Sequence, residues 1–174
     1  GLSDHVVKLA QQLNIPVAAD LLSKSCIAES HPLYLGVYGG GMSSKPFVRE
    51  YVESADCVLM LGTFITDMNM GIYTARLDRS HTVLATTESI NVRYHKYDDV
   101  PFEDFLKALN SVKAKPKAKP RIKQPPLPRP LVKSELTDPL TMADVMRIIG
   151  LNLDDNCCVV SDVGDAIFGA VGIR

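Results

Sequence analysis

The fold is decided by residues 55–71, Ala-Asp-Cys-Val-Leu-Met-Leu-Gly-Thr-Phe-Ile-Thr-Asp-Met-Asn-Met-Gly. Residues 57–61 are an uninterrupted apolar run that ends at Gly62, and residues 45–54 before it have the apolar spacing of an amphipathic helix. A short apolar run between a helix and a glycine is typical of a strand buried on both faces, although a buried helical segment has the same pattern. We predict an α/β fold in which 57–61 is the central strand of a parallel sheet.

Two glycine-containing segments are candidates for a ligand site. Residues 62–71 directly follow the predicted strand, and in open α/β sheets ligands bind outside the carboxyl ends of the strands. The cluster of Gly36, Gly39, Gly40 and Gly41 precedes a predicted helix, where backbone N–H groups can approach a phosphate. The cluster lacks the G-x-G-x-x-G spacing and follows no clear strand, so a tight turn or a contact between domains is favoured over phosphate binding.

The periodicity of residues 1–112 predicts a first domain of alternating helices and strands. Helices are expected at 3–13, 45–54 and 102–109, and strands at 15–19, 57–61, 82–86 and 91–97. Residues 20–38 are expected to be irregular. Because an α/β domain normally places a strand before its first helix, we expect the first strand of this domain to lie before Gly1.

The composition changes abruptly at residue 113. Residues 113–136 are rich in proline and lysine, and proline fixes φ and cannot donate a hydrogen bond to a sheet, so we predict an extended linker. Binding of nucleic acid or of an SH3-type module is a weaker alternative for this basic segment. Residues 137–174 then have the pattern of a helix at 139–150, a buried strand at 157–161 and an acidic glycine turn, which is how a second α/β domain begins.

Composition and charge exclude several classes of protein. With 174 residues, 46% of them hydrophobic, the chain can bury a core, and its formal net charge of −1 gives no field that would attract nucleic acid or an anionic membrane. No apolar segment approaches the roughly 20 residues of a membrane helix, and the first residues show no signal pattern, so we expect a cytoplasmic protein.

The sequence offers no evident metal or catalytic residue. The four cysteines have no C-x-x-C spacing, which argues against zinc and redox pairs. The histidines have no carboxylate or cysteine at ligand spacing; they are His5, His31, His81 and His95. The basic and aromatic cluster around His95 is expected to be a solvated strand face rather than an anion site.

Four stretches of the chain carry a family resemblance. They are Leu21-Leu22-Ser23-Lys24-Ser25, Glu29-Ser30-His31-Pro32-Leu33-Tyr34-Leu35-Gly36-Val37-Tyr38-Gly39-Gly40, Ser54-Ala55-Asp56-Cys57-Val58-Leu59-Met60-Leu61-Gly62 and Val160-Ser161-Asp162-Val163-Gly164-Asp165-Ala166-Ile167-Phe168. In this order they resemble thiamine-diphosphate-dependent 2-oxo-acid decarboxylases of the pyruvate and indolepyruvate type. The resemblance implies that residues 1–112 are a central Rossmann-like domain, 113–136 a linker, and 137–174 the start of a truncated C-terminal domain that binds thiamine diphosphate.

The resemblance also implies two cofactor-binding residues. Members of the family contact the diphosphate near a Glu-Thr-Gly-Asp turn, which corresponds here to Asp162-Val163-Gly164-Asp165. Gly164 and Asp165 match and are the expected cofactor-binding residues, whereas Val163 lacks the hydroxyl and Asp162 shortens the glutamate. A glycine turn before a helix can present N–H groups to an anion, but a helix cap is an equally good interpretation of an acidic turn.

For the whole protein, the resemblance implies non-oxidative decarboxylation of a small 2-oxo acid to an aldehyde and carbon dioxide. It implies thiamine diphosphate and Mg²⁺ as cofactors, and a homodimer or homotetramer. The Gly-Asp-Gly metal motif of the family is expected after Arg174, and its activating glutamate and paired histidines before Gly1, so this chain alone is expected to be inactive.

Two alternatives to the decarboxylase interpretation remain open. The first is a module that binds FAD or another nucleotide, because related enzymes such as acetohydroxyacid synthases hold FAD on the corresponding domain; the absent G-x-G-x-x-G fingerprint argues against it. The second is a non-catalytic regulatory or oligomerisation domain.

Overall fold

The computed structural model describes residues 2–113, 139–154 and 156–173. They belong to two compact units, the first unit (residues 1–122) and the second unit (residues 123–174), and each is described by itself. The linker expected at 113–136 lies, apart from Lys113, outside the described residues.

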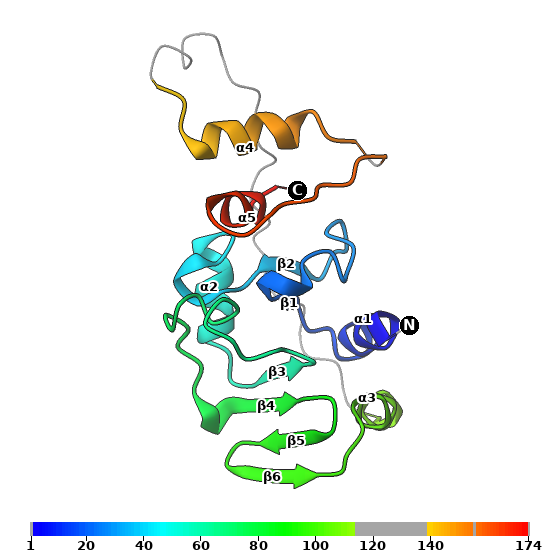
Figure 1. Cartoon of the computed structure of the whole chain (residues 1–174). Coiled ribbons are helices and arrows are strands. Elements are labelled where there is room, and N and C mark those ends of the chain that lie inside the picture. Colours follow the sequence, from blue (N-terminus) through cyan, green and yellow to red (C-terminus); the bar gives the residue numbers. More distant parts are fainter. Residues whose placement is uncertain (1, 114–138, 155, 174) are drawn as a thin grey trace. The chain divides into compact units, whose positions relative to one another are not determined.

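The first unit alternates helices and strands, and its strands form two sheets (Figure 1). In chain order its elements are α1 (Leu2–Leu13), β1 (Val17–Ala19), η1 (Leu21–Ser23), β2 (Tyr34–Val37), η2 (Gly40–Met42), α2 (Pro46–Glu53), β3 (Val58–Leu61), η3 (Arg79–His81), β4 (Thr82–Ala85), β5 (Ser89–Val92), β6 (His95–Asp98) and α3 (Phe102–Ser111). β1 pairs with β2, and β3 to β6 form a four-stranded sheet in that order. The predicted α/β class is confirmed, but the larger sheet is mixed, because only β3 and β4 are parallel within it.

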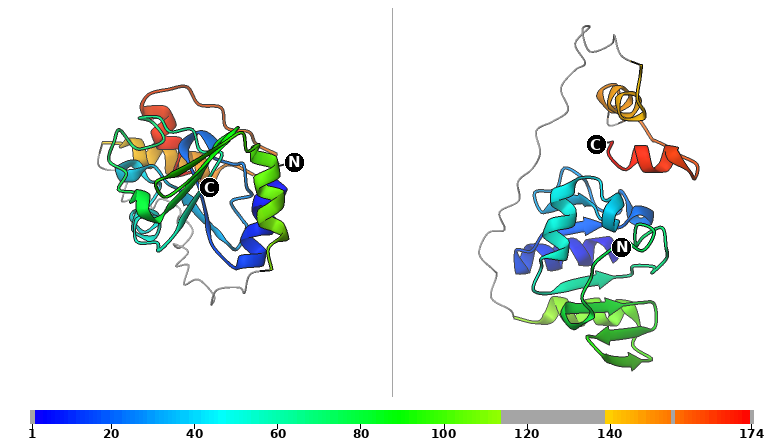
Figure 2. Two further views of the ribbon diagram at one scale, coloured as in Figure 1. Left: turned by 90° about the horizontal axis from the view of Figure 1, so that it is seen from below. Right: turned by 90° about the vertical axis from the view of Figure 1, so that its left-hand side faces the viewer.

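Helices cover both faces of these sheets. α1 and α3 pack side by side on one face, and α2 lies on the opposite face (Figures 1 and 2). Each helix buries apolar residues, among them Leu9 of α1, Leu106 of α3 and Val48 of α2, and Val48 packs with Leu35 and Tyr38. The three predicted helices of this region are confirmed, with small differences at their ends. In the described residues no helix is both long and apolar enough to cross a bilayer.

The strands predicted at 57–61 and 82–86 are confirmed as β3 and β4. They form a parallel ladder in which Leu59 lies opposite Val83. The prediction that β3 is the central strand is wrong: among the described strands it pairs with β4 alone and stands at one edge of the sheet. Met60 is buried, but the other residues of β3 are half-buried, because the second edge of this strand has no neighbouring strand.

Residues 20–38, predicted to be irregular, contain the strand β2, which runs parallel to β1. Gly36 lies within β2 and hides its pattern, since glycine is depleted in strands. The backbone favours glycine here, because Gly36 has a φ of 137°, and a Cβ would also lie 2.7 Å from Ser44 Oγ and 3.0 Å from Val48 Cγ2. Gly36 of the glycine cluster thus lies within β2, and the glycines at 39–41 directly follow this strand, contrary to the sequence interpretation.

The single strand predicted at 91–97 is a hairpin of two strands, β5 and β6. Val92 pairs with His95, so Arg93 and Tyr94 form the turn. Arg93 has a φ of 57°. Turns of this length usually carry asparagine or glycine at such positions, and neither is present to mark the turn in the sequence. All four residues of β6 are exposed, as expected for a solvated strand at the edge of a sheet.

In its described part the second unit contains two helices, α4 (Met142–Leu151) and α5 (Asp165–Ala170). A capping box begins α4: Thr141 Oγ1 accepts the N–H of Asp144 at 3.2 Å, and the Asp144 carboxylate accepts the N–H of Thr141 at 3.1 Å. The helix predicted at 139–150 is thus confirmed with a later start.

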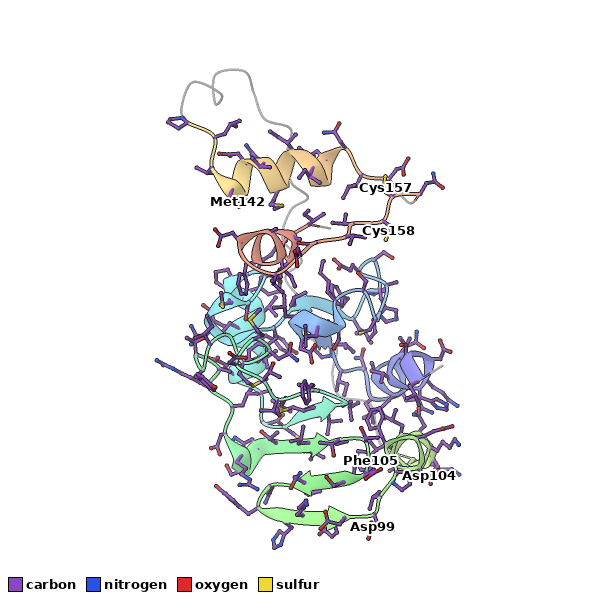
Figure 3. The ribbon with its side chains drawn as sticks, in the orientation of Figure 1. Asp99, Asp104, Phe105, Met142, Cys157 and Cys158 are labelled. Carbon is purple, nitrogen blue, oxygen red and sulfur yellow. The ribbon has the colours of Figure 1, made fainter. Side chains whose placement is uncertain are left out.

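The buried strand predicted at 157–161 is not formed. The segment has no regular secondary structure, Val160 is 92% exposed, and Cys157 and Cys158 lie on the chain between α4 and α5 (Figure 3). A strand needs a neighbour with which to exchange hydrogen bonds, and residues 139–154 and 156–173 include no other strand. Apolar composition alone therefore does not make this segment a strand.

Candidate functional site

Two loops meet at the carboxyl ends of β2 and β3. Residues 62–75, which follow β3, pack against the η2 turn, which follows β2. Thr74 joins these paired loops, because its Oγ1 accepts the N–H of Gly41 at 2.6 Å and donates a hydrogen bond to the carbonyl of Gly71. The two glycine-containing candidate segments of the sequence are thereby brought together in space.

Gly71 sets the distance between the paired loops. A Cβ at this position would lie 1.9 Å from the carbonyl oxygen of Gly39, so the contact admits only glycine. Gly71, Ile72 and Tyr73 have φ angles of 58°, 51° and 61°. This left-handed conformation is costly for a β-branched residue such as Ile72. Contacts around the turn must therefore hold the strained backbone in place.

Asn69 anchors the loop that follows β3. Its side chain is fully buried; Oδ1 accepts the N–H of Leu22 in η1 at 3.2 Å, and Nδ2 donates to the carbonyl of Phe64 at 2.8 Å. Buried polar groups that lose such partners are strongly destabilising, so this amide fixes the loop to η1. The sequence analysis did not identify Asn69. The one sign of its role in the sequence is a polar amide side chain between two methionines.

The glycine cluster uses its backbone groups within the protein. The N–H of Gly39 donates to Ser43 Oγ at 3.1 Å, and the N–H of Gly41 donates to Thr74 Oγ1. A Cβ on Gly40 would lie 2.5 Å from the backbone nitrogen of Ala75. These contacts favour the tight-turn interpretation of the cluster over the phosphate-binding one, because two of its donors already serve the paired loops.

The paired loops present an apolar surface to solvent. Its large exposed side chains are Phe64, Ile65, Ile72 and Tyr73, with Tyr73 82% exposed. Tyr38 donates a hydrogen bond to Glu53 Oε1 at 3.2 Å, and the same oxygen accepts the N–H of Arg76 at 3.1 Å.

Tyr38 and Glu53 form a structural brace between α2 and the loop that follows β3. Burial, and after it the negative charge of Glu53, raise the pKa of Tyr38, so its hydroxyl stays protonated and keeps donating to the carboxylate. Arg49 extends the brace, because it pairs with Glu53 at 3.1 Å and donates to the carbonyl of Thr74 at 3.1 Å. These groups position the paired loops.

The acidic turn of the second unit is open and exposed. Asp162 accepts the N–H of Val163 at 2.7 Å, and Gly164 has a φ of 98° with no heavy atom within 4 Å of the place of a Cβ. Asp165 begins α5, which is only six residues long. The structure thus places the two expected cofactor-binding residues together at one helix start, and their function stays a prediction.

No described cluster of side chains has the composition of a metal or nucleophilic site. Among the described residues, no three His, Cys, Asp or Glu side chains gather in a way that could hold a metal ion. One ring nitrogen of His31 is used in a local hydrogen bond, because its Nδ1 accepts the N–H of Leu33 at 3.2 Å. Partial burial and the charge of Asp20 raise the pKa of the Cys26 thiol, which is the opposite of an activated nucleophile.

Comparison with known proteins gives one family. A sequence model described as thiamine pyrophosphate enzyme, central domain, matches residues 1–108. The indole-3-pyruvate decarboxylase of Azospirillum brasilense is 25% identical over 174 residues, covering 98% of this chain and 32% of that protein. The pyruvate decarboxylase of Candida albicans is 27% identical over 173 residues, covering 98% and 30%. That of Kluyveromyces marxianus is 31% identical over 163 residues, covering 93% and 29%.

The chain spans about a third of the length of these curated relatives. The family match covers α1 through most of α3, the region in which helices flank the parallel β3–β4 pair on both sides. The resemblance seen in the sequence is thereby confirmed: the chain belongs to the thiamine pyrophosphate enzyme family, and residues 1–108 are its central domain.

Proposed function

We propose that the full-length protein is a thiamine-diphosphate-dependent decarboxylase that converts a 2-oxo acid into an aldehyde and carbon dioxide. One observation carries the proposal: the similarity to pyruvate and indole-3-pyruvate decarboxylases runs over 93–98% of the chain. It therefore includes the second unit as well as the central domain. Because a fold hosts many functions, a match to the central domain alone would support no substrate class.

Gly164 and Asp165 are the proposed residues that bind thiamine diphosphate. In the full-length enzyme Mg²⁺ is proposed as the second cofactor. Thiamine diphosphate, when bound, supplies the electron sink for decarboxylation. The donors present here do not fit a diphosphate by themselves, because the turn exposes the carboxylates of Asp162 and Asp165 and the Val163 N–H is already donated. A complete site would need the metal ion and donors from outside this chain.

The proposed contribution of the first unit is structural. Its buried groups brace loops and helices, and the described residues provide no metal cluster. We therefore propose that the 174-residue chain alone has no decarboxylase activity. We further propose that the full-length enzyme is cytoplasmic and acts as a homodimer or homotetramer on a small-molecule substrate.

Expression of the complete reading frame tests the activity. With thiamine diphosphate and Mg²⁺, the full-length protein is expected to release an aldehyde and carbon dioxide from pyruvate or indolepyruvate. We expect Gly-Asp-Gly after Arg174, followed some tens of residues later by asparagine. Absence of that motif together with no turnover of either substrate would overturn the proposal, and bound flavin with yellow colour would support the FAD alternative.

The isolated chain provides the matched control. Calorimetry of the 174-residue chain with thiamine diphosphate and Mg²⁺ is expected to show no binding, because its acidic turn has an incomplete set of donors. Micromolar affinity for this chain would show that the turn forms a diphosphate site without the rest of the enzyme. Size-exclusion chromatography of the full-length protein measures the proposed homo-oligomer.

A further inference from the structure

The turn between β5 and β6 lies at the same end of the larger sheet as η3 and the start of β4 (Figure 1). The N–H of Arg93 in this turn donates to the carbonyl of Thr82, the first residue of β4, at 3.0 Å. Arg79 of η3 reaches the same turn, because its Nε donates to the carbonyl of Arg93 at 3.2 Å. Two arginines that are 14 positions apart in the sequence are therefore joined at one turn.

Contacts within the protein hold the side chain of Arg79 in place. Besides the hydrogen bond from Nε, its guanidinium lies over the ring of Tyr94, 5.8 Å from the centroid, a distance at which the ring attracts a cation. In the part of the chain that the structure describes, the two Nη groups of Arg79 have no hydrogen-bond partner. A guanidinium whose position is already fixed loses little freedom when its remaining N–H groups bind a ligand.

Arg93 adopts a backbone conformation that suits glycine better than arginine. Its φ of 57° is uncommon for a residue with a side chain, and two-residue hairpin turns usually carry glycine or asparagine at such a position. The side chain does not offset this cost, since among the described residues it has no hydrogen-bond or ion-pair partner. An arginine that strains the backbone and has no partner within the protein indicates a function in binding.

The acidic groups near the turn do not cancel its positive charge. Asp78 caps η3, and its carboxylate accepts the N–H of Ser80 at 2.7 Å. This carboxylate supplies one negative charge, against the two positive charges of the arginines. In β6 the side chains of Lys96 and Asp98 form an ion pair at 2.6 Å, so they add no net charge. The turn therefore has an excess of positive charge.

We propose that Arg79 and Arg93 form a site for the phosphate group of a small phosphorylated molecule. A guanidinium donates two parallel N–H bonds to an oxyanion. A phosphate monoester has three acceptor oxygens and close to two negative charges at neutral pH, so it accepts from both arginines at once. A carboxylate has only two oxygens, which one arginine already occupies.

The sequence by itself favours a solvated strand face for the cluster around His95. The structure changes this interpretation at the turn alone, because η3 brings Arg79 to Arg93. The exposed side chains of β6 remain a solvated face. The site uses none of the residues assigned to thiamine diphosphate, so it is independent of the proposed decarboxylase activity.

NMR titration of the 174-residue chain tests the proposal. At neutral pH and constant ionic strength, sodium phosphate and glycerol 3-phosphate should each shift the Nε–H of Arg79 and the amides of Arg93 and Tyr94 until the shifts saturate. Sodium acetate should bind about tenfold more weakly or worse. Equal affinity for acetate, or no shift at the turn with either phosphate, would overturn the proposal. So would binding to vesicles of phosphatidic acid with no shift from glycerol 3-phosphate, since the turn would then recognise a membrane surface.

Three variants make the test specific. Arg93→Gly removes one guanidinium and introduces the residue that the backbone conformation favours, so the hairpin should stay folded while phosphate affinity falls about tenfold or more. Arg79→Gln leaves the turn sequence intact and should weaken binding to a similar extent. Lys107→Gln in α3 is the matched control, because it removes a positive charge that pairs with Glu103 at 2.8 Å, and it should leave the affinity unchanged. Unchanged affinity in both arginine variants, or an equal loss in the lysine variant, would overturn the assignment of the site to this turn.

Discussion

The first and second units contain similar apolar runs with different outcomes. Residues 58–61 form β3 and pair with β4, whereas the apolar run at 157–161 has no regular structure in the described second unit. Helices, in contrast, form in both units. In the second unit α4 begins with its own capping box at Thr141 and Asp144. The comparison teaches that nearby residues can specify a helix, whereas a strand depends on a neighbour that is distant in sequence.

Fluorescence can follow the first unit by itself. The chain has no tryptophan, and its six tyrosines all lie between residues 34 and 97. Urea denaturation monitored by tyrosine fluorescence therefore reports on the first unit, and the amide resonances of α4 report on the second. A substitution in one unit and a matched control substitution in the other can then test how far the two units differ in stability.

The largest effect is expected for Gly71→Ala in the paired loops. The new Cβ would meet the carbonyl of Gly39 at 1.9 Å, so the loops must separate and the free energy of unfolding of the first unit should fall by about 4 kcal/mol. The control is Gly172→Ala in the second unit, where the Cβ would have 3.8 Å to the carbonyl of Gly169. A first unit that unfolds at the same urea concentration with and without the Gly71 substitution would rule out close packing of the loops.

A smaller loss is expected for Leu106→Ala in α3. Leu106 is fully buried, so removing three carbons leaves a cavity and should lower the free energy of unfolding of the first unit by about 3 kcal/mol. Leu151→Ala in α4 is the matched control, because Leu151 is 38% exposed and has less apolar surface to lose. Comparable losses in the two units, measured by fluorescence for Leu106 and by α4 amide exchange for Leu151, would remove the contrast in burial between them.

The smallest effect is expected for Thr141→Ala, which removes one half of the capping box of α4. Loss of such a cap costs about 1 kcal/mol of helix stability, seen as faster exchange of the first α4 amides with unchanged tyrosine fluorescence. Hydrogen bonds from Thr141, and after them the charge of Arg147, lower the pKa of Asp144 below its ordinary value of 3.8. The contribution of the Asp144 carboxylate is therefore complete above pH 3.8 and is lost as the pH falls further. If α4 loses stability at the same acid pH with and without the Thr141→Ala substitution, the hydrogen bonds between Thr141 and Asp144 do not stabilise the helix.

Local signals in the sequence were sufficient for most of the first unit. The helices and the strands β1, β3 and β4 follow from apolar spacing, and a site in the residues after Gly62 was expected from the position of β3. β2 was missed because Gly36 interrupts its pattern, and the turn between β5 and β6 was missed because Arg93 adopts a conformation that asparagine or glycine usually marks.

The remaining differences concern contacts between distant residues. The amide of Asn69 bonds to Leu22, 47 positions away, and no periodicity encodes such a bond. The place of β3 at an edge depends on which strands pair, which its own composition does not determine. Gly164 and Asp165 are predicted as cofactor-binding residues only through the family resemblance, because a lone acidic turn has too little chemistry of its own to identify a site.

The hairpin at the far end of the larger sheet has a consequence for behaviour in concentrated solution. β6 presents an open edge to the solvent, and such edges are templates on which other molecules can add strands and aggregate. Here the edge has the sequence His-Lys-Tyr-Asp, and Lys96 and Asp98 form an ion pair at 2.6 Å. Charges of this kind make strand addition unfavourable, so the hairpin protects the sheet from uncontrolled growth on this side.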